Sequence, residues 1–171
     1  MHACKAGQVS GRLAIVCGLP GAGKTTTALI LERELDAVRF SADDWMIRLG
    51  IDLFDAPARQ SIEDLQGALA ERLLRLGGRV IIEWGTWGRS ERDSLRTMAR
   101  TVGAAVELHV LNASSEELWR RVEARALEQR HGHRALTRDD MNGYADAFQA
   151  PDAAEFALYD PPLLETPATR G

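Results

Sequence analysis

Short apolar runs alternate with stretches of helical periodicity along most of the chain. The apolar runs cover residues 12–17, 38–40, 79–83 and 104–111, and such runs are typical of strands buried on both faces of a sheet. Between them, apolar side chains recur at spacings of three and four, which is the pattern of one buried helix face. Parallel strands need crossover connections, which helices usually provide, so the alternation predicts an α/β fold with a parallel sheet.

Polar caps, prolines and glycines mark where the predicted helices begin and end. The longest periodic stretch follows Pro57, which suits a first helical turn, and Gly77-Gly78 closes it. Helices are expected over residues 25–35, 41–49, 57–76, 90–102, 114–126, 137–148 and from 152 to the Pro161-Pro162 pair. No repeat or linker divides the chain, so residues 1–171 are expected to form a single domain. Its tail over 161–171 is expected to be weakly ordered, apart from a short edge strand at 163–164.

Composition narrows the class of protein without indicating a chemistry. Hydrophobic residues make up 45% and charged residues 27% of the 171 positions, which argues against a disordered or fibrous chain. Cys4 and Cys17 are too few for a disulfide framework, and we find no signal peptide or membrane-length apolar stretch, so a cytoplasmic protein is expected. The formal net charge of −4 gives the chain no overall attraction to nucleic acid, although a local basic patch is compatible with it.

The segment from Gly18 to Thr25, Gly-Leu-Pro-Gly-Ala-Gly-Lys-Thr, matches the phosphate-binding P-loop. Glycines let backbone N–H groups turn inward to form an anion nest, and the helix that follows directs its positive end at the same point. Lys24 can then reach the β- and γ-phosphates of ATP, while the Thr25 hydroxyl can hold Mg²⁺. The nucleotide-binding residues that the motif predicts are Gly18, Gly21, Ala22, Gly23, Lys24, Thr25 and Thr26.

P-loops serve several classes of protein, and the rest of the chain selects among them. A GTPase carries an Asn-Lys-x-Asp motif that reads guanine, and the sequence has none. An AAA-type ATPase machine needs a longer chain for its helical lid domain and sensor residues. A chain of this length with a P-loop and a helical lid fits a kinase best.

Three carboxylates follow predicted strands, and the carboxyl ends of parallel strands face the ligand crevice. Asp43 and Asp44 come after the strand 38–40, and each can take a proton from an acceptor hydroxyl or cap the helix that begins there. Glu83 ends the strand 79–83, where a carboxylate can orient Mg²⁺ or its waters, or face the acceptor instead. The residues alone leave these alternatives open.

Arginines and tryptophans are concentrated in two other segments. Six arginines lie between Arg120 and Arg138, and they can close over a transferred phosphoryl group or form a solvated helix paired with neighbouring glutamates. Trp84 and Trp87 lie among glycines directly after the third predicted strand. There they can line an acceptor pocket or cover the edge of the core.

These segments together resemble the AAA_33-type P-loop kinases, a group related to polynucleotide 5′-kinase, chloramphenicol phosphotransferase and zeta toxin. The resemblance rests on the P-loop, on Phe-Ser-Ala-Asp-Asp-Trp at 40–45, on Val-Ile-Ile-Glu-Trp-Gly-Thr-Trp at 80–87, and on Glu-Leu-Trp-Arg-Arg-Val-Glu-Ala-Arg at 117–125. It extends over roughly residues 12–160. It implies a P-loop NTPase three-layer sandwich, with a five-stranded parallel sheet in the order 2-3-1-4-5 and a helical lid at about residues 120–140.

The resemblance also implies roles for individual residues. By position, the general base of the family falls on Asp43. Its lid arginines fall on Arg125 and Arg130, with Arg121 and Arg134 as second choices.

The chain departs from the family pattern at two positions. Glu83 stands where many relatives carry Asp. Only Arg48 lies near the position at which polynucleotide kinases carry a phosphate-binding arginine, which argues against a nucleic-acid acceptor and agrees with the acidic net charge.

We therefore expect an ATP- and Mg²⁺-dependent kinase acting on a hydroxyl of a small molecule, such as an antibiotic, a nucleoside or a sugar nucleotide. The expected catalytic residues are Lys24, Asp43, Glu83, Arg125 and Arg130; the substrate-binding residues are Asp43, Asp44, Arg48, Trp84 and Trp87; and the metal-binding residues are Thr25 and Glu83. A polynucleotide 5′-hydroxyl kinase and a nucleotide-gated switch protein with slow ATP hydrolysis are the alternatives.

Overall fold

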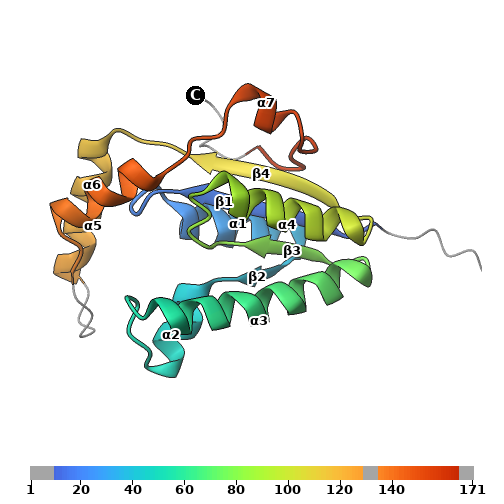
Figure 1. The fold of residues 1–171 in the computed structure, drawn as a ribbon, viewed down its shortest axis with the longest axis horizontal. Helices are drawn as coiled ribbons and strands as arrows, with labels where there is room; N and C mark the ends of the chain where they lie inside the picture. Colours follow the sequence, from blue (N-terminus) through green and yellow to red (C-terminus); the bar gives the residue numbers. More distant parts are fainter. Residues whose placement is uncertain (1–9, 129–134, 166–171) are drawn as a thin grey trace, which may run out of the picture.

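A parallel β-sheet lies at the centre of the structure, with helices packed on both of its faces (Figure 1). The computed structural model describes residues 10–128 and 135–165. In this part of the chain the strands are β1 (Arg12–Gly18), β2 (Val38–Phe40), β3 (Arg79–Ile82) and β4 (Ala105–Leu111). They lie in the order β2-β3-β1-β4, and all neighbours are parallel, so the predicted α/β fold with a parallel sheet is confirmed.

Helices lie between the strands and follow β4 along the chain, and several of them begin at a residue whose side chain caps the first turn. They are α1 (Lys24–Leu35), α2 (Ala42–Leu49), α3 (Ala56–Arg75), α4 (Arg89–Thr101), α5 (Ser115–Glu128), α6 (Arg138–Ala147) and α7 (Ala153–Phe156). Ser41 caps α2, Asp55 caps α3 with Pro57 in its first turn, and Thr137 caps α6. None of the described helices is long and apolar enough to cross a membrane.

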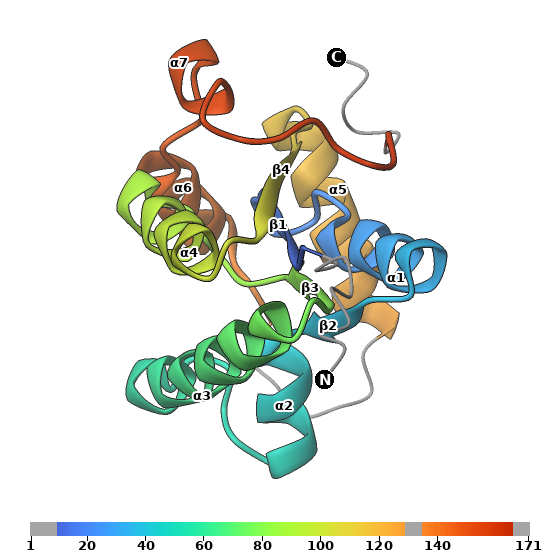
Figure 2. The ribbon, with the colours of Figure 1, turned by 90° about the vertical axis from the view of Figure 1, so that its right-hand side faces the viewer.

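The sheet separates two apolar clusters (Figure 2). On one face, α3 and α4 cover Leu13 and Ile15, and on the other, α1 and α5 cover Ala14 and Val16. Successive residues of β1 therefore point to opposite faces and are buried on both, as in the centre of a parallel sheet. Cys17 belongs to the α3–α4 cluster, and burial raises the pKa of its thiol to about 11.

The sheet ends at β4, next to which a fifth strand was expected. Residues 163–164 form a bend, so the expected edge strand, and with it the five-stranded sheet, is wrong for the described part of the chain. Asp160 occupies the edge instead: the Val106 N–H donates to its carboxylate (2.7 Å), and its own N–H donates to the Val106 carbonyl (2.8 Å). Pro161 and Pro162 follow directly, and because proline has no N–H to donate, a strand ladder cannot continue there.

A buried carboxylate on β4 joins the edge strand to β1 and to the C-terminal segment. Glu107 accepts hydrogen bonds from Arg12 and from the Leu163 N–H (3.1 Å), and its second oxygen lies 3.0 Å from Nε2 of His109. Burial alone would raise the pKa of Glu107, but the bonds from His109, Arg12 and Leu163 outweigh it and hold that pKa below its ordinary value.

Candidate active site

The P-loop connects β1 to α1 through a tight turn, in which the Ala22 N–H donates to the Leu19 carbonyl (3.1 Å). Gly21 and Gly23 have positive φ angles of 81° and 97°, which glycine adopts without a side-chain clash. A Cβ at Gly21 would lie 2.7 Å from the Leu118 carbonyl oxygen on α5, whereas a Cβ at Gly23 would meet no described atom within 4 Å. The loop therefore packs against α5 on one side and leaves room for an anion at the N-terminus of α1 on the other.

Lys24 is the first residue of α1, and several charged side chains of the site act on it. Its Nζ donates to the Leu19 carbonyl (3.1 Å). Burial lowers the pKa of Lys24, while the negative charges of Glu83 and Asp43 raise it and the positive charge of Arg125 lowers it further. The structure thus brings four of the five predicted catalytic residues into one electrostatic neighbourhood.

Glu83 follows β3 and has a buried side chain beside the P-loop. The Thr25 hydroxyl donates to one of its oxygens, and the Arg39 guanidinium donates to the other (2.6 Å). Burial raises the pKa of Glu83, and the bonds from Thr25 and Arg39 offset only part of this. Hydroxyl and carboxylate oxygens are the donors that Mg²⁺ prefers, so this pair fits a magnesium ion beside a bound phosphate. Thr26 is exposed one residue further along α1.

Asp43 and Asp44 are adjacent in the first turn of α2 but point toward different arginines. The side chain of Asp43 is 59% exposed and accepts a hydrogen bond from Arg59 on α3 (2.7 Å). Asp44 accepts a bond from Arg39, whose guanidinium also holds Glu83. Asp43 is therefore held by α3, whereas Asp44 belongs to the network around Glu83.

Further polar groups surround Arg59. Glu63 on α3 lies 3.9 Å from its guanidinium. Burial raises the pKa of Glu63; Arg59 lowers it, and the charges of Glu91 and Asp43 raise it further. The N-terminal parts of α2, α3 and α4 therefore contribute carboxylates to one neighbourhood. Arg48, in the last turn of α2, is exposed and forms no hydrogen bond or ion pair with the rest of the described chain.

The two tryptophans after β3 have different surroundings. Trp84 donates to Gln66 on α3 (2.7 Å) and packs against the apolar cluster beneath α3 and α4. Trp87 donates to the Gly18 carbonyl (3.3 Å), and its ring centre lies 4.6 Å from that of Tyr144 on α6. Trp84 thus lies toward α2 and α3, and Trp87 lies between the P-loop and α6.

Of the predicted lid arginines, two lie in the described part of α5. Arg121 donates to the Gly21 carbonyl of the P-loop (3.3 Å), and the charge of Arg125 acts on Lys24. Arg130 and Arg134 lie outside the described residues.

A protein-family model described as an AAA domain, AAA_33, matches residues 13–151. The chain belongs to the AAA_33 family. The match includes the P-loop, both aspartates of α2, Glu83 and α5, so the resemblance expected from the sequence is confirmed.

Individual relatives of this AAA_33 chain include kinases. A gluconokinase from Arabidopsis thaliana is 27% identical over 136 residues, which cover 72% of this chain and 71% of the relative. A solved gluconokinase from Sinorhizobium meliloti 1021 has 19% identity and a TM-score of 0.56, with 85% of this chain and 79% of that one covered. An APS kinase from Mycobacterium tuberculosis, in complex with AMPPNP and APS, has 19% identity and a TM-score of 0.57, with coverages of 83% and 84%.

A chain of the Pnkp1/Rnl/Hen1 RNA repair complex is also similar, with 24% identity and a TM-score of 0.68. The match covers 88% of this chain and 46% of that one, so the AAA_33 chain spans about half the length of that solved chain. At these identities, the solved structures show a shared fold.

Two arginines of the AAA_33 site are absent from the sequence-based predictions. Arg39 lies in β2 between Val38 and Phe40, and a cation within an apolar strand needs a buried partner, which is a signal that the sequence does contain. Arg59 lies one turn after the cap residue Asp55, where an arginine is ordinary, so no sequence pattern distinguishes it.

Proposed function

We propose that the protein is an ATP- and Mg²⁺-dependent kinase that transfers the γ-phosphate of ATP to a hydroxyl of a small-molecule acceptor. The observation that supports this best is the P-loop itself, whose Thr25 hydroxyl donates to the buried Glu83, while the charges of Glu83, Asp43 and Arg125 act on Lys24. Phosphoryl transfer depends mostly on positioning and on charges arranged around the transferred group, and this arrangement supplies both signs of charge there.

The nucleotide side of the reaction falls to the P-loop and β3. The loop amides and Lys24 bind the β- and γ-phosphates, and Thr25 and Glu83 hold Mg²⁺. The metal, when bound, neutralises the charge that develops on the phosphate oxygens. Arg39 keeps the Glu83 carboxylate in place by donating to its second oxygen (2.6 Å).

The acceptor side falls to α2, α3 and α5. Asp43 accepts the proton of the attacking hydroxyl, while Arg59, which donates to that carboxylate (2.7 Å), orients it. Arg125 on α5, whose charge acts on Lys24, stabilises the charge of the transferred phosphoryl group.

Acceptors with several hydroxyls suit the polar groups around Arg59. Asp43 and Glu63 offer hydrogen-bond acceptors beside a single guanidinium that can bind a carboxylate. The Arabidopsis gluconokinase, which is covered over 71% of its length, supports testing polyhydroxylated acids such as gluconate first. Nucleosides, sugar nucleotides and aminoglycoside or phenicol antibiotics complete the acceptor pool.

The decisive test is acceptor-dependent consumption of ATP. We expect one acceptor pool to raise turnover, and we expect Asp43→Asn to lower kcat by about 100-fold or more, because a general base contributes about 10² to 10⁴ in rate. The exposed α3 residue Asp64 gives a matched control, and Asp64→Asn should keep the wild-type rate. An active Asp43→Asn enzyme would exclude Asp43 as the base.

The nucleotide site is tested separately. Lys24→Ala should abolish ATP turnover, and retention of full turnover would overturn the proposal. An oligonucleotide acceptor whose affinity falls steeply with salt would instead support the polynucleotide kinase. ATP hydrolysis that no acceptor accelerates would support the nucleotide-gated switch.

A further inference from the structure

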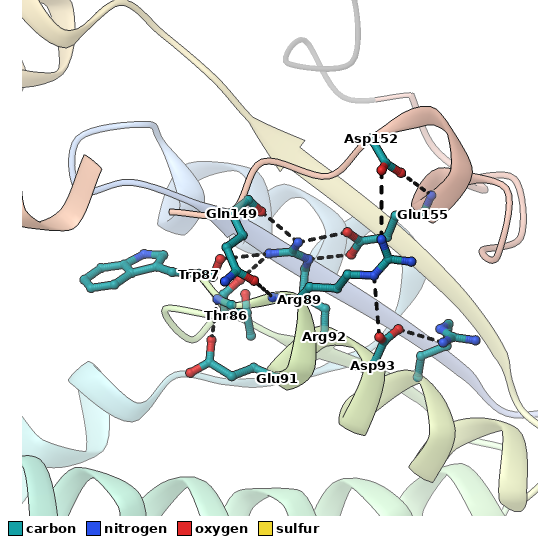
Figure 3. A network of polar contacts seen from close by, with 11 residues as sticks. Thr86, Trp87, Arg89, Glu91, Arg92, Asp93, Gln149, Asp152 and Glu155 are labelled. Atoms are coloured by element: carbon teal, nitrogen blue, oxygen red, sulfur yellow. Dashed lines mark hydrogen bonds and ion pairs between the residues drawn. The ribbon is translucent and has the colours of Figure 1, made fainter. Parts of the chain in front are cut away.

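A fully buried arginine lies behind the loop that follows β3, outside the catalytic groups described above (Figure 3). Arg92 on α4 has no exposed surface, and Glu155 on α7 is 1% exposed. The Arg92 Nε and Nη2 donate to the two oxygens of Glu155 at 2.7 and 3.0 Å. This bidentate pair joins segments that are 63 residues apart in the chain.

The remaining donors of Arg92 are used on backbone carbonyls. Its Nη1 donates to the carbonyls of Thr86 and Trp87, both at 3.1 Å, and its Nη2 donates to that of Gln149 (2.8 Å). The donors of a planar guanidinium point in fixed directions, so their bonds constrain the relative positions of these carbonyls. The guanidinium also places a positive charge beside the carbonyl oxygens.

A second set of bonds joins the same two segments. The Gln149 N–H donates to the Trp87 carbonyl (3.0 Å), and the Arg89 N–H donates to the Gln149 side chain (2.8 Å). Asp152 caps α7 by accepting from the Glu155 N–H (2.7 Å). The loop after β3 and the segment after α6 are therefore fixed to each other, as Figure 3 shows.

Within the described residues, this junction reaches the candidate active site through the side chain of Trp87. Trp87 donates to the carbonyl of Gly18, the first glycine of the P-loop, and packs against Tyr144 on α6. Its neighbour Thr86 has a φ of 42°, a left-handed conformation that a β-branched residue adopts only when its surroundings enforce it. The bond from Arg92 to the Thr86 carbonyl is such a constraint.

We propose that Arg92 is a positioning residue of the kinase site, which fixes the Trp87 loop and thereby sets α6, the helix that follows the lid arginines, against the P-loop. This inference rests on the proposed function for its catalytic consequence, but its structural consequence stands independently. Three bonds to backbone carbonyls of two segments point to positioning, and a buried ion pair is seldom more stabilising than well-packed apolar residues of similar size.

The test replaces the ion pair by apolar side chains in a double variant, Arg92→Met with Glu155→Leu. Such a replacement leaves no unpaired buried charge, although the carbonyls of Thr86 and Gln149 lose the bonds from Arg92, so the folded fraction is measured first by circular dichroism. Arg96 lies one turn further along α4 and pairs with Asp93, so Arg96→Met is the matched control. If the double variant does not fold, Arg92→Lys retains the charge pair with fewer donors and takes its place in every measurement.

Hydrogen exchange gives a readout that needs no enzyme activity. In the double variant, we expect the Gln149 and Arg89 amides to exchange at least about tenfold faster, while the β1 amides stay unchanged and Arg96→Met behaves as wild type. Unchanged exchange at Gln149 and Arg89 would overturn the inference even if no acceptor were ever found.

The kinetic readout uses the acceptor identified in the turnover screen. We expect kcat, corrected for the folded fraction, to fall at least about tenfold, while the Kd of ATP changes by less than about threefold. A purely structural pair would leave the corrected kcat unchanged, and that result would also overturn the inference. Failure of the proposed function itself is recognised differently, since it leaves wild type without acceptor-dependent turnover.

Discussion

Two buried glutamates have pKa values shifted in opposite directions by their surroundings. Glu83 lies beside the P-loop with its pKa raised by burial, whereas Glu107 on β4 has its pKa held down by three hydrogen-bond donors. A raised folded-state pKa stabilises the fold below the ordinary value of 4.5, and this contribution is lost as the pH rises through the folded pKa. A lowered one stabilises the fold above 4.5, and this contribution is lost as the pH falls through the folded pKa.

The two glutamates therefore predict opposite pH signatures for one type of substitution. Relative to wild type, Glu83→Gln should gain unfolding free energy as the pH rises above the ordinary pKa of 4.5, and Glu107→Gln should gain it as the pH falls below 4.5. Urea unfolding of the three proteins across this range measures both trends. Parallel stability curves for the two variants would contradict the assigned environments.

At the scale of single residues, the sequence predicts those site residues that belong to a recognisable motif or strand end. Lys24 and Thr25 follow from the P-loop, and Glu83 from its place at a strand end. It cannot predict how Asp43 and Asp44 divide between Arg59 and Arg39, because that depends on how α3 packs beside α2. The chemical roles of these residues remain predictions until turnover is measured.

At the scale of elements, the turn of the P-loop and its contact with α5 can be separated experimentally. Gly21 and Gly50 both have positive φ angles, 81° and 68°. Alanine at Gly50 would meet no described atom within 4 Å, so Gly50→Ala should cost only the left-handed backbone penalty of about 1–2 kcal/mol. Gly21→Ala should cost more, because its Cβ would lie 2.7 Å from the Leu118 carbonyl oxygen.

Urea unfolding and ATP binding of both glycine variants check this prediction. Gly21→Ala should also weaken ATP binding, because the loop must move away from α5, whereas Gly50→Ala should bind ATP like wild type. Equal destabilisation of the two variants would show that the approach to α5 imposes no constraint.

The succession of strands and helices along the chain follows from the hydrophobic pattern. The expected strand at residues 163–164 is the exception, and its absence has a local cause. Alternation of apolar runs with amphipathic stretches is enough to predict the parallel sheet and its crossover helices. It is not enough at residues 163–164, where the backbone bonds of the Val106 edge are already taken by Asp160. Periodicity also says nothing about the buried Arg92, whose partner Glu155 lies on the short helix α7.

For the whole molecule, Asp160 decides how the sheet ends. Without its carboxylate, the Val106 N–H would lose its partner, and Arg100 would lose a 2.7 Å ion pair. Asp160→Ala should therefore destabilise the fold by about 1–3 kcal/mol and promote association at the exposed β4 edge.

Thermal unfolding and light scattering measure the two effects of Asp160→Ala. Glu71→Ala, which removes an exposed ion pair with Arg75, is the control and should change stability by less than about 0.5 kcal/mol. If Asp160→Ala is as stable and as monodisperse as this control, other residues must protect the β4 edge from association.

The buried thiol of Cys17 has a practical consequence for labelling. With a pKa of about 11, only roughly one thiol in ten thousand is ionised at neutral pH, and the thiolate is the form that reacts with maleimides and peroxide. Once Cys4 is replaced by serine, the folded protein becomes a nearly silent background for a single introduced cysteine. A fluorophore attached at exposed Arg48 would then report events at α2 without removing the strand residue that leads into the P-loop.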